Sequence, residues 1–163
     1  MTAPLYQVKI YTDGACRKNP GPGGYAAVLL WKDTRREISA GFRKTTNNRM
    51  EMMAAIEGLR LLKQPCDVAV FSDSRYLVDC ISKKWYIKWR ANGWVTAGGE
   101  PVKNRDLWEV LITLLDKHRV IFLWVRGHAG NVENERCDEL AVAAARGKDL
   151  PCDEGFELSL ALT

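Results

Sequence analysis

The apolar side chains of this sequence first recur with the period of β-strands and then, from residue 48 onward, with the period of helices. Residues 5–12 alternate between apolar and polar side chains, and residues 23–31 (GGYAAVLLW) form a mostly apolar run; both patterns predict strands. Residues 36–43 (REISAGFR) are consistent with a third strand. The connections between the three are short, which favours an antiparallel meander.

Helical spacing begins with residues 48–63, where Met52, Ile56 and Leu59 share one face, and Pro65 ends that helix. Further along the chain, strands are predicted at 67–72 and 120–125, and helices at 75–82, 107–117 and 135–146. The stretch between the second and third helices shows no regular period. The resulting order, β-β-β-α-β-α-α-β-α, predicts an α/β fold in which a five-stranded mixed sheet is flanked by helices.

The length of 163 residues is enough for one domain with a substantial core, and no linker or repeat divides the sequence. We therefore expect a single domain over residues 1–163. Its composition, 47% hydrophobic and 27% charged, excludes a wholly disordered chain. No apolar run approaches the roughly 20 residues that span a bilayer, and the first residues, MTAPLYQVKIYTDG, do not resemble a secretory signal.

The five cysteines are odd in number and lack CxxC spacing. This pattern favours reduced thiols in a cytoplasmic protein over a disulfide framework or a zinc site. The net charge of +4 permits a polyanionic partner but does not require one. The class of partner therefore has to be inferred from where the charges lie along the chain.

Four acidic side chains stand out because each lies at or near the end of a predicted element. They are Asp13, Glu51, Asp73 and Asp138. Each also has a purely structural interpretation. Asp13-Gly14 is typical of a turn after the first strand. Asp73 can cap the helix that follows it, and Glu51 can complete a capping box with Asn48.

Asp138 can be a solvated charge on the last helix. Ala141, Val142 and Ala145 share its helical face, however, and a small apolar face suits a carboxylate poorly. Side chains at strand ends and at a helix N-terminus can converge on one rim of a sheet, and carboxylates held close together repel one another unless they are protonated or bridged by cations. Hard divalent ions such as Mg²⁺ or Mn²⁺ prefer oxygen ligands, and two of them about 4 Å apart activate a water for phosphodiester cleavage.

Five segments together resemble bacterial-type ribonuclease HI, of the ribonuclease H type 1 family. They are YTDGACRKNPGPGGYAAVL, TTNNRMEMMAAI, FSDSRYLV, PVKNRDLW and WVRGHAGNVENERCDELA, and they are collinear over about residues 5–146. The resemblance implies a ribonuclease H-like fold. It also implies an endoribonuclease that cleaves the RNA strand of RNA–DNA hybrids by two-metal-ion hydrolysis, with little sequence preference, leaving 3′-hydroxyl and 5′-phosphate ends.

By this resemblance, two Mg²⁺ ions, or Mn²⁺ in their place, would be held by the four carboxylates Asp13, Glu51, Asp73 and Asp138. His128, in RGHAGN, would assist proton transfer or product departure, because an imidazole with a pKa of about 6.5 can do either at neutral pH. Asn134 matches a family asparagine that helps to orient the site; its alternative role is that of a helix cap.

The resemblance also assigns contacts with the hybrid. The residues that would line the minor groove beside the RNA strand are Cys16, Asn19, Asn47, Asn48 and Arg75, the last at a position where related proteins often have glutamine. Selection of RNA would depend on its 2′-hydroxyl groups. A basic protrusion at about residues 83–103 would grip the DNA phosphates through Lys83, Lys84, Lys88 and Arg90. The tryptophans among them, Trp85, Trp89 and Trp94, are interpreted as packing residues.

Two other functions fit parts of the pattern: a metal-dependent DNA nuclease of the same fold, such as a resolvase, and a nucleic-acid-binding module without catalysis. The basic protrusion and Asn47-Asn48 argue against the first. The complete carboxylate set argues against the second, because clustered negative charge beside phosphates does not help a pure binder. We expect a monomer that does not associate with membranes. The C-terminal tail, residues 147–163, has no clear pattern, and whether it binds a partner stays open.

Overall fold

The computed structural model describes residues 6–127 and 130–162. Within them, the strands are β1 (Val8–Cys16), β2 (Gly21–Trp31), β3 (Thr34–Thr45), β4 (Asp67–Ser72) and β5 (Arg119–Trp124). The helices are α1 (Asn47–Arg60), α2 (Arg75–Ser82), α3 (Trp85–Ala91), α4 (Arg105–Lys117), α5 (Val132–Ala145) and α6 (Glu154–Ala161). None of the helices in this part of the chain is long and apolar enough to cross a lipid bilayer.

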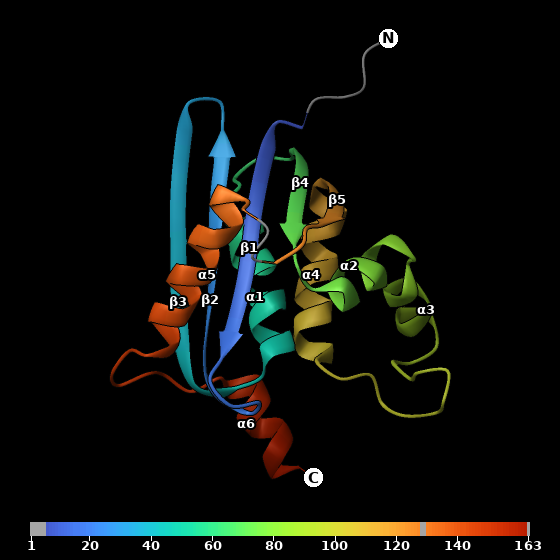
Figure 1. The fold of residues 1–163 in the computed structure, drawn as a ribbon. Helices are drawn as coiled ribbons and strands as arrows, with labels where there is room; N and C mark the ends of the chain where they lie inside the picture. Colours follow the sequence, from blue (N-terminus) through green and yellow to red (C-terminus); the bar gives the residue numbers. More distant parts are fainter. Residues whose placement is uncertain (1–5, 128–129, 163) are drawn as a thin grey trace.

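The strands form a single sheet in the order β3-β2-β1-β4-β5. The first three strands are antiparallel to their neighbours, whereas β4 runs parallel to β1 and β5 runs parallel to β4. Figure 1 shows α5 across one face of the sheet and α1 and α4 behind the other face. The predicted α/β fold, with a five-stranded mixed sheet flanked by helices, is therefore confirmed.

Strand β2 is apolar along nearly its whole length because helices cover both of its faces. Leu29 belongs to the large core on the side of α1. Its neighbour Val28 points the other way and packs with Cys137 and Ala141 of α5. The two cores hold the sheet between two helical layers, so the edge at which its strands end is fixed relative to α1 and α5.

The predicted turn at Asp13-Gly14 is wrong. Strand β1 continues to Cys16, because residues 13–16 pair with residues 23–26 of β2 in a regular antiparallel ladder. Long-range pairing with β2 thus overrides the local turn tendency of the Asp-Gly dipeptide. The helices α3 and α6 were not predicted either; both are short and contain no buried residue, so neither has the apolar stripe that identifies a helix.

The helix caps also differ from the expected ones. Thr46 is the N-cap of α1, and its side chain accepts a hydrogen bond from the Arg49 amide at 3.3 Å. The capping box between Asn48 and Glu51 therefore does not form, and the Glu51 carboxylate is available elsewhere. Ser74, rather than Asp73, caps α2 in the same way.

The C-terminal tail is anchored to the start of α1 by a buried ion pair. The Arg49 guanidinium donates to both carboxylate oxygens of Asp153, at 2.8 and 2.9 Å, and also pairs with Asp106 of α4. The Thr45 hydroxyl donates to the same Asp153 carboxylate at 2.7 Å. These contacts hold the turn that carries Asn47 and Asn48, so the tail supports one side of the candidate site.

Candidate active site

The parallel pairing of β1 with β4 brings Asp13 and Asp73 to the same edge of the sheet. The two strands pair from Val8 opposite Val68 to Tyr11 opposite Phe71, and the Thr12 hydroxyl donates to the Phe71 carbonyl at 2.9 Å. Asp13 lies within β1, two residues beyond the last residue that pairs with β4, and Asp73 follows the last residue of β4. The carboxyl ends of neighbouring parallel strands are where ligands bind in open α/β sheets.

Glu51 reaches the same edge from α1. The Gly14 amide donates to the Glu51 carboxylate at 3.1 Å and to the Asp13 carboxylate at 2.9 Å, so one backbone N–H bridges the two acids. The approach of α1 to β1 requires glycine at position 14, because a Cβ there would lie 2.6 Å from the Glu51 amide nitrogen. The small residue after Asp13 is thus needed for helix–strand contact.

The three carboxylates form a compact cluster. One oxygen from each of Asp13, Glu51 and Asp73 lies within 4.8 Å of the other two, and Asp13 and Glu51 are only 4% and 3% exposed. Asp138 of α5 is half-buried and is not part of this group of three. Its negative charge nevertheless acts on both Asp13 and Asp73, which places it beside the cluster.

The electrostatics of the cluster favour protonation when no cation is bound. Burial, together with the negative charges of Asp73 and Asp138, raises the pKa of Asp13 from 3.8 to about 7. Burial and the charges of its two neighbours raise the pKa of Glu51 well above its ordinary value. Burial also raises the pKa of Asp73. A divalent cation would offset this repulsion and allow all three groups to be ionised at neutral pH.

The donor set suits a hard divalent ion. It consists of carboxylate oxygens alone, the ligand type that Mg²⁺ and Mn²⁺ prefer. Among the described residues, Glu51 Oε2 is a buried oxygen without a hydrogen-bond partner. A buried, unpaired carboxylate oxygen is costly in a protein interior unless something binds it. The residues present therefore fit a metal site.

Two of the predicted substrate residues contact each other beside this cluster. The Asn19 side-chain oxygen accepts a hydrogen bond from the Asn47 amide at 3.0 Å, which links the β1–β2 loop to the start of α1. Asn47 and Asn48 are exposed. The Cys16 thiol, at the end of β1, donates to the Lys18 carbonyl at 2.6 Å. The same sulfur lies 3.5 Å from the Thr45 carbonyl oxygen, so these contacts join the end of β1 and the β1–β2 loop to the residues at the start of α1.

Asn134 lies inside α5 rather than at its start. The N-cap is Asn131, whose side chain accepts from the Asn134 amide at 3.0 Å, so the helix-cap alternative for Asn134 is wrong. Asn134 is 3% exposed, and its Nδ2 has no hydrogen-bond partner among the described residues. An unpaired buried donor is available to orient a bound group. His128 lies outside the described residues.

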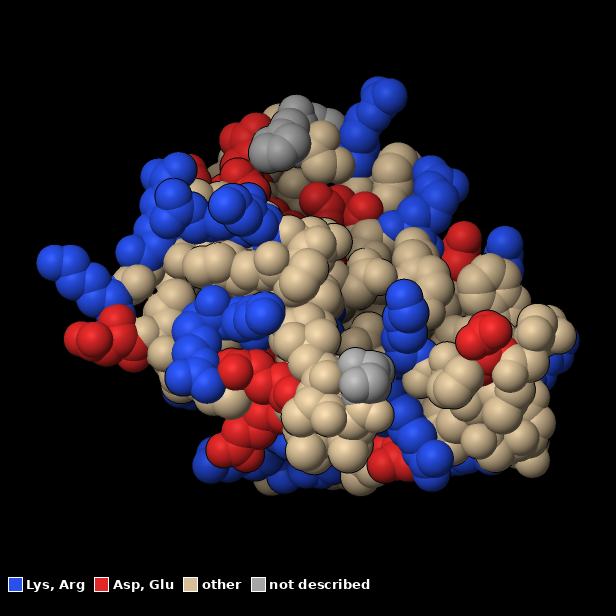
Figure 2. Space-filling model, turned by 90° about the horizontal axis from the view of Figure 1, so that it is seen from below, with Lys and Arg blue, Asp and Glu red and all other residues tan. Residues whose placement is uncertain are grey.

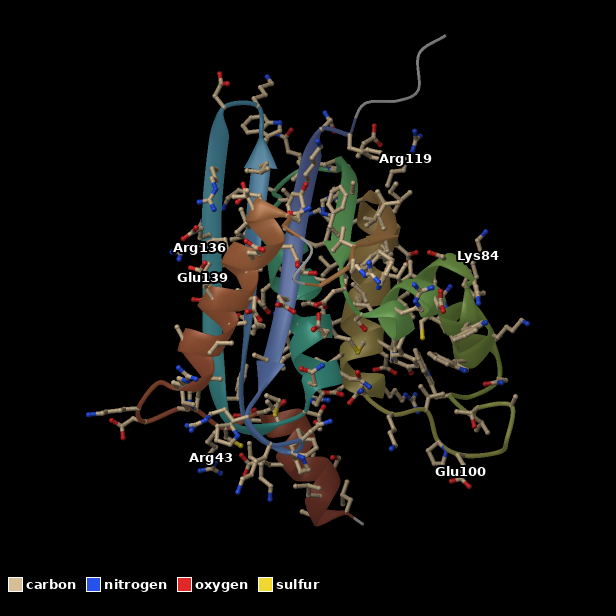
Figure 3. The ribbon with its side chains drawn as sticks, in the orientation of Figure 1. Arg43, Lys84, Glu100, Arg119, Arg136 and Glu139 are labelled. Atoms are coloured by element: carbon tan, nitrogen blue, oxygen red, sulfur yellow. The ribbon has the colours of Figure 1, made fainter. Side chains whose placement is uncertain are left out.

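The basic protrusion contains α3 and the loop that follows it. The four predicted phosphate contacts, Lys83, Lys84, Lys88 and Arg90, are all exposed. Figure 3 shows Lys84 and Glu100 on this protruding part, away from the sheet. Figure 2 shows basic side chains in several groups, separated by acidic side chains and uncharged surface. Positive charge is thus spread over this side of the molecule.

The tryptophans near the protrusion pack as expected. Trp94 and Trp108 are buried, and the ring of Trp89 meets that of Trp108 edge-on with the centroids 5.6 Å apart. Trp85 and Trp89 are half-buried against the core. The aromatic side chains therefore hold the protrusion on the domain. Of the four cations, Lys83 and Arg90 each lie 3.9 Å from a carboxylate, that of Asp79 and that of Asp116.

Sequence reasoning missed Trp124, the last residue of β5. Its indole N–H donates to the Asp73 carbonyl at 3.2 Å, and the Arg75 guanidinium lies 4.2 Å from the centre of its ring. The sequence did contain a signal. Trp124 is followed by Val-Arg-Gly-His at the end of a predicted strand, and a large apolar side chain next to a loop is unfavourable unless it makes a specific contact. Only the pairing of β5 with β4 shows that it contacts Asp73.

Known proteins resemble this chain over most of its length. The chain matches the family model described as RNase H over residues 6–146. Ribonuclease H of Desulforamulus reducens is 58% identical over 149 residues, which cover 91% of this chain and 94% of that protein. Ribonuclease HI of a Synechocystis species is 58% identical over 150 residues, with the same two coverages.

Solved structures are similar as well. LC9-RNase H1, described as a type 1 RNase H with the type 2 active-site motif, matches with a TM-score of 0.78 and 32% identity, over 92% of this chain and 77% of that one. LC11-RNase H1, solved in complex with an RNA/DNA hybrid, matches with a TM-score of 0.58 and 26% identity, over 85% of this chain and 96% of that one.

A mixed sheet with a carboxylate cluster at the end of its parallel strands defines a candidate site for a nuclease that uses divalent metal. The family match spans most of the chain, and the identity of 58% to two ribonucleases H far exceeds that of a shared fold alone. The chain belongs to the ribonuclease H family.

Proposed function

We propose that this protein is an endoribonuclease that hydrolyses the RNA strand of RNA–DNA hybrids with the help of bound divalent metal. The observation that carries the proposal is the cluster of Asp13, Glu51 and Asp73, whose oxygens lie within 4.8 Å of one another, with Asp138 beside it. Membership of the ribonuclease H family supports the same activity.

In this proposal Asp13, Glu51, Asp73 and Asp138 hold two Mg²⁺ ions, with Mn²⁺ as a substitute. Bound ions of this kind supply an activated water and stabilise the leaving oxygen, which would give 3′-hydroxyl and 5′-phosphate ends. The protein's own contribution is to hold the carboxylates in a fixed, largely buried arrangement. His128 would move a proton or help the product to leave.

The substrate would lie across the edge of the sheet. Cys16, Asn19, Asn47, Asn48 and Arg75 would contact the RNA strand in the minor groove, with Asn134 orienting the scissile phosphate. Discrimination against DNA would come from the 2′-hydroxyl groups, which donate and accept hydrogen bonds. The four exposed cations of the protrusion would bind the DNA phosphates without reading sequence.

We further propose that the protein is a single domain that acts as a monomer in the cytoplasm. All five cysteines are free thiols, which agrees with a reducing compartment.

A substrate panel tests the proposal. Labelled RNA–DNA hybrid, duplex DNA, duplex RNA and single-stranded RNA are each incubated with the protein in Mg²⁺ and in EDTA. We expect cleavage of the RNA strand of the hybrid in Mg²⁺ alone. Preferential cleavage of duplex DNA would instead indicate a DNA nuclease of the same fold, and binding without cleavage of any substrate would indicate a binding module.

A further inference from the structure

Trp124 combines high exposure with two specific contacts. The side chain is 42% exposed and lies at the end of β5, the strand at one edge of the sheet. Its indole N–H donates to the backbone carbonyl of Asp73, and its ring stacks with the guanidinium of Arg75. One side chain thus touches both a proposed metal ligand and a proposed substrate contact, and core packing does not account for it.

The indole contacts the backbone just beyond the point where β4 and β5 stop pairing. The last backbone bond of this pairing runs from the Val125 amide to the Ser72 carbonyl at 2.9 Å. The next residue, Asp73, follows β4, and its carbonyl accepts from Trp124 Nε1 at 3.2 Å. Because this bond holds the peptide plane after Asp73, it restricts the direction in which the Asp73 carboxylate projects.

The segment that leaves β5 also leaves room for the Asp73 carboxylate. A Cβ at position 127 would lie 3.0 Å from Asp73 Oδ2, which is tighter than an ordinary contact. Glycine at this position therefore allows the loop to pass beside the carboxylate without displacing it. Trp124 thus contacts the backbone of Asp73, and Gly127 lies beside its carboxylate.

The Trp124 ring also restricts the conformation of the Arg75 side chain. Arg75 is exposed at the first turn of α2, where a flexible side chain would sample many rotamers. Its guanidinium lies 4.2 Å from the Trp124 ring centroid, a cation–π distance. A guanidinium that is already placed loses less conformational freedom when it donates to a ligand.

We infer that Trp124 is a positioning residue for hybrid cleavage: its indole N–H sets the Asp73 carboxylate, and its ring places Arg75 for contact with the nucleic acid. The inference rests on the proposed function. Two substitutions separate the two effects of the Trp124 side chain. Phenylalanine keeps an aromatic face but has no N–H, whereas leucine has neither.

The test measures kcat and KM for the hybrid, and hybrid binding in EDTA, for Trp124→Phe, Trp124→Leu and Arg75→Ala. Trp31→Phe is the matched control, since Trp31 is also exposed, at 48%, has Lys32 near its ring, and lies at the far end of β2. We expect Trp124→Phe to lower kcat about 10-fold, the scale of a displaced reacting group, with KM and metal-free binding within about twofold.

Trp124→Leu should also weaken metal-free binding about two- to fivefold, the worth of an exposed cation–π contact. Arg75→Ala should then weaken binding by a smaller factor in the Trp124→Leu background than in the wild type. Gly127→Ala serves as a second variant for Asp73; it should lower kcat without changing metal-free binding.

Two results would overturn the inference. The first is a kcat for both Trp124→Phe and Gly127→Ala equal to that of Trp31→Phe. The second is an Arg75→Ala effect of the same size in both backgrounds. Failure of the proposed function gives a different result, because the wild-type protein itself would then not cleave the hybrid.

Discussion

Asp13→Asn should stabilise the metal-free protein at the same time as it abolishes hybrid cleavage. The Asp13 carboxylate is 4% exposed and lies in a cluster with two other acids, and these surroundings raise its pKa from 3.8 to about 7. Holding this group ionised above pH 7 corresponds to about 4 kcal/mol of repulsion and lost hydration. Screening by solvent at the open side of the site reduces this unfavourable energy. We therefore expect the free energy of unfolding of Asp13→Asn to exceed that of the wild type by about 1–3 kcal/mol.

The sign of the pH dependence follows from proton binding. Between about pH 4 and pH 7 the folded wild-type protein binds more protons at Asp13 than the unfolded chain does, so its stability falls as the pH rises through that range. Asparagine does not titrate, and the variant should lose this part of the pH dependence. The stabilisation should therefore be large at pH 8 and small at pH 4.

Urea unfolding in EDTA at pH 4 and pH 8 measures the effect, and repetition at pH 8 with Mg²⁺ measures the metal contribution. Asp33→Asn is the control, because Asp33 is exposed in the turn between β2 and β3. Added Mg²⁺ should stabilise the wild-type protein more than the Asp13→Asn variant. A variant that is less stable than the wild type at pH 8 in EDTA would refute the reasoning about repulsion within the cluster.

The remaining predictions concern pH, the tail and the protrusion. At Mg²⁺ concentrations too low to saturate the site, hybrid cleavage should rise with pH up to about pH 7 and then level off, since Asp13 must lose its proton to bind metal, and a flat pH–rate profile at low Mg²⁺ would contradict this. Asp153→Ala removes the more deeply buried of the two carboxylates that pair with Arg49 and should cost about 3 kcal/mol by urea unfolding; a cost below about 1 kcal/mol would show that the tail is not an anchor. Lys88→Ala, on the exposed side of α3, should lower the slope of log affinity against log salt by about one for the hybrid, and an unchanged slope would place the phosphates elsewhere.

The strand and the helix on either side of Asp73 could be predicted because the sequence patterns that indicate them are local. The strand at 67–72 was predicted with the bounds that the structure has, and the next helix was predicted to begin at residue 75, where it does, since an apolar run is followed there by Ser-Asp-Ser and a new helical period. The position of Asp73 between them follows from this pattern alone. The parallel pairing that places Asp13 next to it does not.

Other features depend on contacts between distant parts of the chain. The extended conformation at Asp13-Gly14 comes from pairing with β2, which outweighs the turn tendency of that dipeptide. The anchoring of the tail comes from Arg49 and Asp153, which are 104 residues apart in the sequence. The role inferred for Trp124 depends on the register of β5 against β4. Local propensity contains no information on such pairings.

The most direct test of the account is the chemistry of the cleavage products. An RNA–DNA hybrid labelled at the 5′ end of its RNA strand is cut in Mg²⁺, and the ends of the RNA fragments are analysed. We expect 3′-hydroxyl ends, formed only when divalent metal is present and lost in Asp13→Asn. Cleavage in EDTA, or fragments that end in a 2′,3′-cyclic phosphate, would show that a 2′-hydroxyl rather than a metal-activated water is the nucleophile, and would contradict it.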